Sequence, residues 1–566
     1  MKSRVLSAYR VIDRRIDPEL LAIMLLPISL LILDSRWAYS PLGFIDGWVY
    51  NAYFRDLPQI LKDFPLLYYG TRLPWIIPGY VIYHFFPPLI ANGVLHLLVY
   101  TVNTVSLYLI VRMVFNRRIA FVAALLMGSY SYFLTSIGWD YIDAVLLAYF
   151  LLALLCLTWS ARSGYLGIGL AGIACAACIY TNLYAVLLVP PLVVYFFFQR
   201  DRRHNLMLSG LVFGLGMAVL TVILGLVNMV MGGEFLFFMP SVVVAGDASK
   251  VILSDPVLYW MIHASWLAFP LTGLITSIIF LLRRKVWLAA RENRCIVLFP
   301  ALLIFACCLF LSNLVIGRPV PFEFPYYTSL LIPLVFLAFS AQLFIYTQDA
   351  TDSAWWGIAI AAAVILVLPY GLNALGDQGF PYWKIIPILP GLLCCLGAFI
   401  VFTRDASITT KMVFFFALVS LANFTIYPDR LLPFTTHNTV DGFNAVDISF
   451  AAMKNVDAHN GLYIWYRFND PLRPVYVSAA IMPIMIADGR VSDNFPELTS
   501  QRLGFYKPLR AGNKMAIFST DPDALVKART TLIQNGLDAR LIRVVSIHEG
   551  TIQFTITLVE LTTLLL

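Results

Sequence analysis

An aspartate within an aromatic segment is the group in this chain whose setting best suits chemistry. Asp46 lies in the sequence FIDGWVY at residues 44–50, shortly after an apolar run that ends near Leu33. A carboxylate among aromatic side chains at a membrane surface is partly desolvated, which raises its basicity toward that of a general base. Asp46 could instead cap a helix that starts at Gly47. Both interpretations remain open from the sequence.

Two further carboxylates, Asp140 and Asp143, lie three residues apart in the sequence GWDYID at residues 138–143. On a helical turn this spacing puts both carboxylates on one face, where they could share a cation or hold the hydroxyl groups of a sugar. Trp139 and Tyr141 between and beside them offer stacking faces. Either aspartate could also cap the apolar helix that follows.

Two arginines in the first polar stretch could bind a phosphate. Arg72 lies in the sequence YYGTRLPW at residues 68–75, and Arg55 follows the aromatic segment that contains Asp46. A guanidinium can hold phosphate oxygens through two parallel N–H bonds, so we predict that these arginines bind a lipid phosphate. The alternative is that each extends its charge to the headgroups, as arginines at a membrane surface ordinarily do.

These groups lie between apolar runs that indicate a membrane protein. The chain has 566 residues, of which 60% are hydrophobic and 13% charged, and a mean hydropathy of +0.80. Such a composition excludes a soluble enzyme, a secreted disulfide scaffold and a disordered protein. About thirteen runs are long enough to cross a bilayer core of roughly 30 Å. They lie near residues 20–33, 89–111, 119–137, 144–160, 164–181, 184–198, 206–231, 263–282, 295–316, 327–346, 354–372, 385–402 and 412–427.

The distribution of Lys and Arg predicts the orientation of these spans. With the N-terminus in the cytoplasm, 19 basic residues of the membrane part fall on the inner side and 7 on the outer side, as the excess of positive charge in cytoplasmic loops requires. The odd number of spans then places the C-terminus outside. Asp46, Arg72 and Asp143 all fall on the outer face, where the first loop should contain short interfacial helices over 47–63 and after Pro74.

The composition changes after Tyr427. From Pro428 onward 26 of 139 residues are charged, which predicts an extracytoplasmic domain over 428–566 behind a transmembrane domain over 1–427. Strands are expected at 462–467, 514–519, 541–547 and 551–558, with a helix that starts near Thr520 and ends at Gly536, so this domain is α/β. All eight cysteines lie in apolar stretches, and none follows Cys395.

Two other patterns are discounted. The sequence GIGLAG at residues 167–172 resembles a dinucleotide-binding loop, but it lies inside an apolar span, which favours helix packing through small residues. No basic run with interleaved aromatic residues indicates a nucleic-acid surface, so we expect no nucleic-acid partner.

Together these features resemble the GT-C superfamily of polytopic glycosyltransferases, in particular bacterial members similar to protein O-mannosyltransferases and aminoarabinose transferases. The resemblance rests on Asp46 after the first span, the long first outer loop, the acids of the second outer loop, eleven or more spans and an outer C-terminal domain. It implies a GT-C-like α-helical polytopic membrane protein with a C-terminal α/β extracytoplasmic domain.

The resemblance also implies an activity. A protein of the bacterial cytoplasmic (inner) membrane would transfer a hexosyl or pentosyl group from a polyprenyl-phosphate donor to a glycan, lipid or protein acceptor in the periplasm, with inversion. Asp46 would be the general base, and Arg72 or Arg55 would stabilise the departing phosphate. Asp140 and Asp143 would orient the acceptor or, as in metal-dependent members, help to hold a divalent cation.

The alternative class is a polytopic transporter or a lipid-linked-sugar flippase. Such proteins place ionisable residues near the bilayer midplane and often contain related halves with broken helices. Here the acids and bases cluster at the ends of the spans. A third class is a scaffold whose tail binds envelope partners, but a scaffold would give the acids of the first loop no function. Of the three classes, the sequence favours the enzyme.

Overall fold

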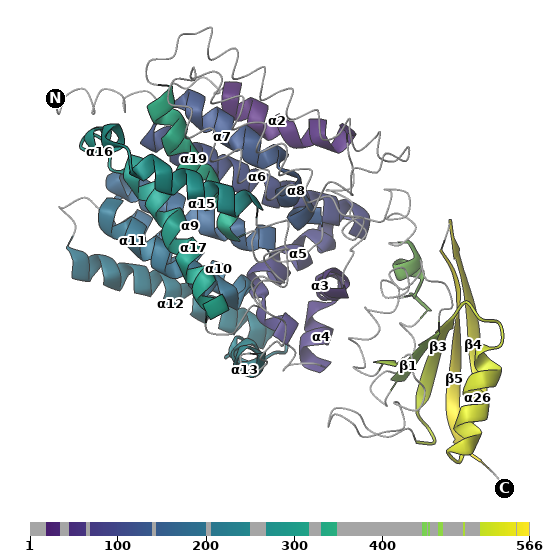
Figure 1. The fold of residues 1–566 in the computed structure, drawn as a ribbon. Coiled ribbons are helices and arrows are strands. Elements are labelled where there is room, and N and C mark those ends of the chain that lie inside the picture. Colours follow the sequence, from purple (N-terminus) through teal and green to yellow (C-terminus); the bar gives the residue numbers. More distant parts are fainter. Residues whose placement is uncertain are drawn as a thin grey trace.

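A computed structural model gives the arrangement of the chain in a helical part and a sheet near the C-terminus (Figure 1). The described residues are 18–33, 45–63, 68–138, 143–199, 205–248, 268–315, 330–347, 444–449, 451–452, 462–467, 491–492, 510–550 and 552–564.

The helical part contains apolar helices at ten of the predicted spans. They are α2 (Pro18–Leu33), α6 (Pro88–Val114), α7 (Arg117–Ser129), α8 (Ser131–Gly138), α9 (Asp143–Ser163), α10 (Tyr165–Thr181), the 3-10 helix η3 (Leu183–Leu188), α11 (Val189–Gln199), α12 (Leu206–Val230), α15 (Ala268–Leu281), α17 (Cys295–Val315) and α19 (Ile332–Tyr346). By length and composition, α6, α9, α12 and residues Cys295–Asn313 of α17 can each cross a membrane. The last three predicted spans lie outside the described residues, so the count of thirteen stays a prediction.

Two predicted spans differ from the structure. The span expected over 119–137 is divided at Tyr130, whose backbone is extended and whose N–H donates to Met127 O. The span expected over 184–198 begins as η3, because Asn182 caps this turn through Tyr184 N. The prediction of one continuous helix was therefore wrong for both spans.

Glycines bring α10 and α12 unusually close together. A Cβ atom at Gly172 would lie 2.1 Å from Phe213 O, and one at Gly216 would lie 2.1 Å from Gly169 O. Both distances are far shorter than any real Cβ contact, so these backbones can touch only where the side chain is hydrogen. This confirms that the sequence GIGLAG at residues 167–172 serves helix packing.

The other face of α12 carries exposed aliphatic side chains, including Leu211, Leu215 and Leu226. An exposed apolar face along a 25-residue helix fits contact with lipid tails rather than with water. The six cysteines of the described residues lie in α9, α10 and α17 and are all free thiols.

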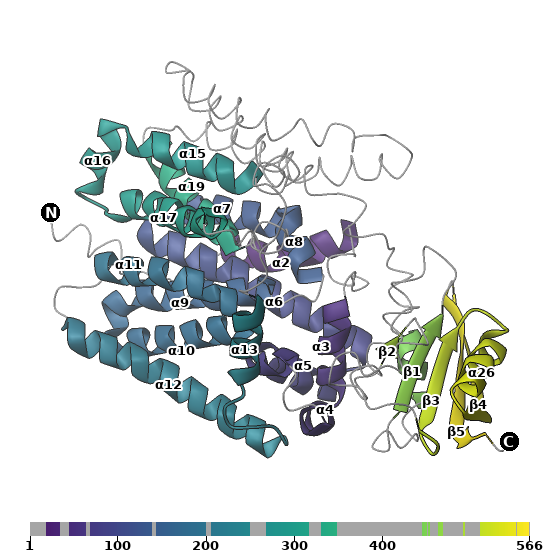
Figure 2. The same ribbon diagram turned by 60° about the horizontal axis from the view of Figure 1, so that its bottom comes forward.

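Five short elements gather at one end of the helical part. They are α3 (Ile45–Arg55), α4 (Leu57–Asp63), the 3-10 helix η2 (Tyr68–Thr71), α5 (Leu73–Phe85) and α13 (Met239–Ala248). The single helix expected over 47–63 is interrupted at Asp56, because Pro58 has no amide hydrogen to donate to Phe54 O. The short helix α16 (Arg284–Ala290) lies at the opposite end (Figures 1 and 2).

The sheet near the C-terminus lies on the side of α3 to α5 (Figure 2). Its strands are β1 (Leu462–Arg467), β2 (Val491–Ser492), β3 (Lys514–Ser519), β4 (Leu537–Glu549) and β5 (Ile552–Thr563), in the order β2-β1-β3-β5-β4. β1 runs parallel to β2 and β3, while β5 is antiparallel to β3 and β4.

Helix α26 (Ala524–Gln534) covers one face of the sheet, where Ala528 and Leu532 pack against Met515 and Val559. The expected strands and the helix between them are confirmed, although β4 starts at Leu537 rather than at 541. The boundary between domains at 427 and 428 lies outside the described residues and stays a prediction.

Candidate functional site

Arg72 lies in a cage of tyrosine rings at the junction of η2 and α5. Its guanidinium carbon is 5.6 Å from the ring centroid of Tyr50, 5.1 Å from that of Tyr68 and 5.5 Å from that of Tyr69. All three distances are within the range of about 6 Å over which a cation is attracted to an aromatic face. Tyr50 comes from α3, so the cage joins two elements that are separate in sequence. We call these four residues the Arg72 cage.

The turn that carries Arg72 is fixed on both sides. Thr71 Oγ1 donates to Tyr68 O over 2.6 Å, and it also hydrogen bonds to the Ser241 hydroxyl in α13. A Cβ atom at Gly70 would lie 3.1 Å from the Tyr53 hydroxyl, a tight contact, so α3 packs closely against this turn. Burial raises the pKa of Tyr53, which keeps its hydroxyl protonated. The backbone that presents Arg72 is therefore held between α3 and α13.

Asp46 is the second residue of α3, and its backbone but not its side chain is within the described part. Residues four apart share one face of a helix, so Asp46 and Tyr50 lie on the same face of α3. Phe54, one turn further along, packs edge-on against Trp75 of α5 with 5.2 Å between ring centroids. Helices α3 and α5 thus bring the predicted base and the predicted phosphate ligand into the same region of the fold.

Arg55 is engaged at the other end of α3. Its Nε donates to Asn51 Oδ1 over 2.8 Å, and its Nη1 forms an ion pair with Asp447. Asp447 belongs to a short helical segment, residues 444–449, that precedes β1 in the chain. The sequence predicted a phosphate ligand at Arg55 and contained no signal for this partner.

Asp143 is the first residue of α9 and is fully buried. The next carbonyl oxygen, that of Ala144, accepts a hydrogen bond of 2.9 Å from Asn103 Nδ2 in α6. A carboxylate in the first turn also interacts favourably with the helix dipole, as the capping interpretation requires. Asp140 lies outside the described residues, so the expected pairing of the two acids stays a prediction.

The described residues contain no group of three or more His, Cys, Asp or Glu side chains that could hold a metal ion. Asp143 is the one predicted metal ligand whose side chain is described, and a hard divalent cation takes six or more oxygen ligands. This part of the chain therefore does not by itself form a cation site.

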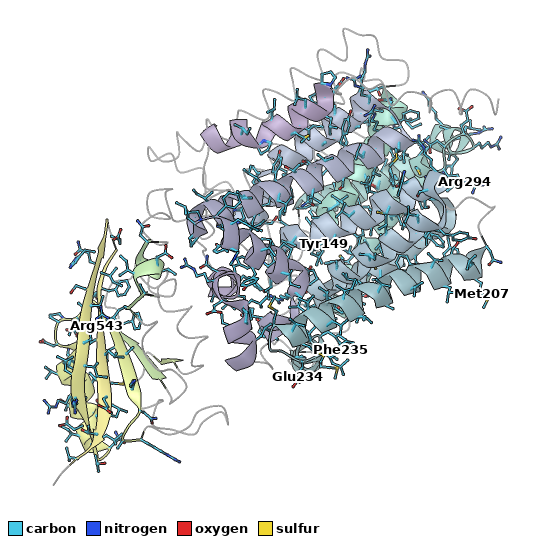
Figure 3. The ribbon with its side chains drawn as sticks, turned by 180° about the vertical axis from the view of Figure 1, so that it is seen from behind. Tyr149, Met207, Glu234, Phe235, Arg294 and Arg543 are labelled. Carbon is cyan, nitrogen blue, oxygen red and sulfur yellow. The ribbon has the colours of Figure 1, made fainter. Side chains whose placement is uncertain are left out.

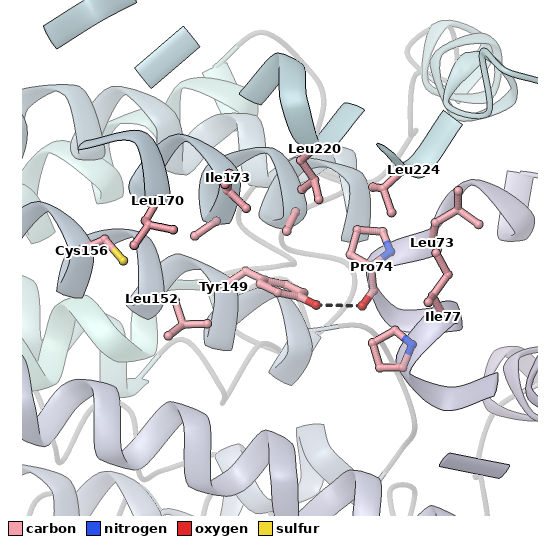
Figure 4. Close-up of a pocket in the computed structure, with 13 residues that line it drawn as sticks. Leu73, Pro74, Ile77, Tyr149, Leu152, Cys156, Leu170, Ile173, Leu220 and Leu224 are labelled. Carbon is pink, nitrogen blue, oxygen red and sulfur yellow. Dashed lines mark hydrogen bonds between the residues drawn. The ribbon is translucent and has the colours of Figure 1, made fainter. Parts of the chain in front are cut away.

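An apolar cavity of about 370 Å³ lies beside α5, between α9, α10 and α12 (Figure 4). Its walls are mainly aliphatic side chains such as Leu73, Ile173 and Leu220. The side chain of Tyr149 also lines the cavity, and its hydroxyl donates to Pro74 O over 2.8 Å (Figure 4). Pro78 has no N–H to donate to this carbonyl, so Tyr149 provides the hydrogen bond that the helix cannot make.

Sequence reasoning missed Tyr149. The signal was present, because prolines four residues apart in a helix leave one carbonyl oxygen without its usual donor. Which hydroxyl would reach that oxygen depends on how α9 packs against α5, and no local pattern contains that information.

The model of a family described as dolichyl-phosphate-mannose-protein mannosyltransferase matches residues 90–238, about a quarter of the chain. A comparison with curated proteins gave no significant match.

Solved structures similar to this chain include two crystal structures of ArnT from Cupriavidus metallidurans. The structure in the apo state is 14% identical, with 90% of this chain and 92% of that chain covered and a TM-score of 0.45. The structure bound to undecaprenyl phosphate is 13% identical, with 95% and 98% covered and a TM-score of 0.46. These likenesses are too weak to transfer any residue or ligand.

The family match extends from the first turn of α6 to Phe238, just before α13. It does not include α3, η2 or α5, which carry Asp46 and the Arg72 cage. For the segment that it covers, the match confirms the predicted resemblance to the GT-C glycosyltransferases.

Proposed function

We propose that this protein is an inverting glycosyltransferase of the GT-C type in the bacterial inner membrane. It moves a hexosyl or pentosyl group from a polyprenyl-phosphate donor to a glycan, lipid or protein acceptor on the outer face. The observation that carries the proposal is the Arg72 cage, a guanidinium held by Tyr50, Tyr68 and Tyr69 where α3 and α5 meet. The family match over 90–238 supports the reaction class.

Arg72 binds the phosphate of the donor in this mechanism. Its planar guanidinium can hold two phosphate oxygens at once, and the surrounding rings restrict its position. When the bond between the anomeric carbon and the phosphate oxygen breaks, negative charge accumulates on the polyprenyl phosphate. A fixed cation stabilises that charge more in the transition state than in the ground state, which is the condition for catalysis.

Asp46 acts as the general base. It removes the proton from the acceptor hydroxyl while the acceptor oxygen bonds to the anomeric carbon on the side opposite the phosphate. This in-line displacement inverts the anomeric centre. Asp140 and Asp143 orient the acceptor or help to hold a divalent cation.

The site is proposed to face outward, with the N-terminus in the cytoplasm and the C-terminal domain in the periplasm. The placement of Arg294 supports this orientation, because its side chain lies at one end of the helical part and Glu234 lies at the other (Figure 3). Arg283, Arg284 and Lys285 flank the start of α16 near Arg294. The basic end of the helical part is thus remote from α3 and α5.

The test uses the full-length protein in lipid nanodiscs with a panel of labelled polyprenyl-phosphate sugars and a cell-envelope extract. Release of polyprenyl phosphate is compared between wild type and Asp46→Asn, which keeps the size of the side chain and removes the base. We expect turnover to fall by about 100-fold or more while donor binding is retained.

Asp56→Asn is the matched control, because Asp56 is an exposed carboxylate that directly follows α3. Its turnover should equal that of wild type. Unchanged turnover in Asp46→Asn would return Asp46 to the role of a helix cap. Absence of turnover with every donor, in a protein that moves labelled lipid across the bilayer, would favour the flippase instead.

A further inference from the structure

The helical segment 444–449 connects the two parts of the structure. Val446 is fully buried in the same apolar core as Tyr50 and Trp75 of the helical part. At its start, Asn444 Nδ2 donates to Glu549 Oε2 over 3.2 Å, at the end of strand β4. One short segment therefore contacts both the membrane helices and the C-terminal sheet.

A chain of polar contacts runs from this segment into α3 and α5. Asp447 forms an ion pair with Arg55, and Arg55 Nε donates to Asn51 Oδ1 over 2.8 Å. The amide of Asn51 then donates through Nδ2 to the Tyr83 hydroxyl in α5 over 2.7 Å. Since Asn51 is 1% exposed, its amide is held in one orientation by partners on both sides.

We propose that the segment 444–449 is a strut that sets the position of α3, and that Arg55 and Asp447 are positioning residues for the site at Asp46 and Arg72. The inference rests on the proposed function. It assigns the C-terminal part of the chain a task in the reaction, because Asn444 links the same strut to β4.

The geometry of α3 explains how a contact at Arg55 reaches the site. Arg55 is the last residue of this 11-residue helix, Asp46 is the second, and Tyr50 in the middle belongs to the Arg72 cage. A helix moves as a rod about 16 Å long, so a shift at one end changes the position of the other. Misplacing a catalytic group by about 1 Å can lower a rate on the order of 100-fold.

The position of Arg55 favours this role over phosphate binding. Its side chain is 14% exposed, and its Nε and Nη1 are occupied by Asn51 and Asp447. A phosphate at Nη1 would compete with the carboxylate of Asp447. A cation at the C-terminal end of a helix also interacts favourably with the helix dipole, so Arg55 stabilises α3 in the position where Asp447 holds it.

A charge exchange tests the proposal in the full-length protein in nanodiscs. The variants are Arg55→Asp, Asp447→Arg and the double variant that carries both changes. Each single change should lower kcat about tenfold and leave the KM for the donor within about twofold, because α3 carries Asp46 and is displaced, while Arg72 with Tyr68 and Tyr69 lies outside α3 and still binds the donor. The double variant should recover most of the loss, since the ion pair is restored with reversed polarity.

A phosphate ligand at Arg55 would give the opposite pattern. Arg55→Asp would then raise the donor KM, Asp447→Arg would have little effect on turnover, and the double variant would stay as defective as Arg55→Asp. That pattern would overturn the proposal. Asp538→Asn is the matched control, because it breaks the ion pair of Arg529 with Asp538 within the C-terminal part, and it should leave kcat unchanged.

Hydrogen exchange separates failure of the strut from failure of the proposed function, because it requires no turnover. In full-length Asp447→Asn, the amides of α3 should exchange faster than in wild type, while those of α26 should be unchanged. Unchanged exchange in α3 would overturn the strut whether or not a donor has been found. Faster exchange in α3 without any glycosyltransferase activity would support the strut and count against the enzyme.

Discussion

The guanidinium of Arg72 is both charged and planar, and both properties favour its contacts with the surrounding tyrosine rings. Three tyrosine rings lie 5.1 to 5.6 Å from its guanidinium carbon. A guanidinium is weakly hydrated and stacks on aromatic faces, whereas an ammonium is a compact and strongly hydrated charge. The two cations are therefore not interchangeable at this position.

Replacing Arg72 by Lys should accordingly lower kcat/KM for the donor about tenfold, because the charge remains but the two-point hold on phosphate is lost. Arg72→Gln, which also removes the charge, should lower it on the order of 100-fold or more. Steady-state kinetics with a labelled donor in nanodiscs would measure both. Equal kcat/KM values for Arg72→Lys and wild type would mean that a point charge suffices.

The sequence identified Arg72 and Asp46 as groups to examine, but it did not identify the cage. Tyr68 and Tyr69 are neighbours of Arg72 in sequence, whereas Tyr50 reaches it only because α3 packs against η2 and α5. The partner of Arg55 was even harder to predict, because Asp447 is 392 residues away in the sequence. A contact over such a separation leaves no local pattern in a single sequence.

Among the elements, α5 depends on a neighbouring helix for one of its own hydrogen bonds. Tyr149 of α9 donates to Pro74 O, the oxygen that Pro78 cannot serve. Because α5 starts directly after Arg72, the same bond helps to hold the first turn of α5 next to the Arg72 cage. The spacing of the prolines in the sequence is a signal for the unpaired oxygen, which the sequence analysis did not use, but it does not identify the helix that supplies the donor.

Tyr149→Phe should leave Pro74 O without this donor and destabilise the fold by about 1 kcal/mol. The displaced start of α5 should also lower donor affinity, which donor titration in nanodiscs would measure. Tyr195→Phe is the control, because it removes a hydroxyl that contacts Thr158 between α9 and α11, away from α5. Equal donor affinity in the two variants would exclude a role of Tyr149 in placing Arg72.

The close contact of α10 and α12 leads to a prediction about glycines. Gly172→Ala and Gly216→Ala would each force a methyl group against a backbone oxygen, so both should lower the free energy of unfolding by about 1 to 3 kcal/mol. Gly210 and Gly214 on the same helix α12 have open space at the Cβ position, so alanine there should be neutral or slightly stabilising. Thermal unfolding in detergent would compare the four variants, and equal melting temperatures would contradict the packing account.

For the whole molecule, the sequence predicted the helical part, the sheet near the C-terminus and the basic end of the bundle. Apolar periodicity and turn residues are local properties, which is why the strands at 462–467 and 514–519 were placed correctly. The break at Asp56 had a signal in Pro58, and the break at Tyr130 had a weaker one in Gly128 and Ser129, which directly precede it. How the sheet is joined to the helices, through residues 444–449, depends on long-range packing that one sequence does not contain.

The location of the cysteines favours site-specific labelling of the C-terminal part of the chain. Those that the structure describes lie in membrane helices, and none of the native cysteines follows Cys395. Maleimides and spin labels react with the thiolate, a charged form that hydrocarbon surroundings disfavour. A single cysteine introduced into α26 would therefore be the preferred target for a dye or a spin label, with no native thiol removed. Distances from such a label to the membrane surface could then be followed in the active protein during turnover.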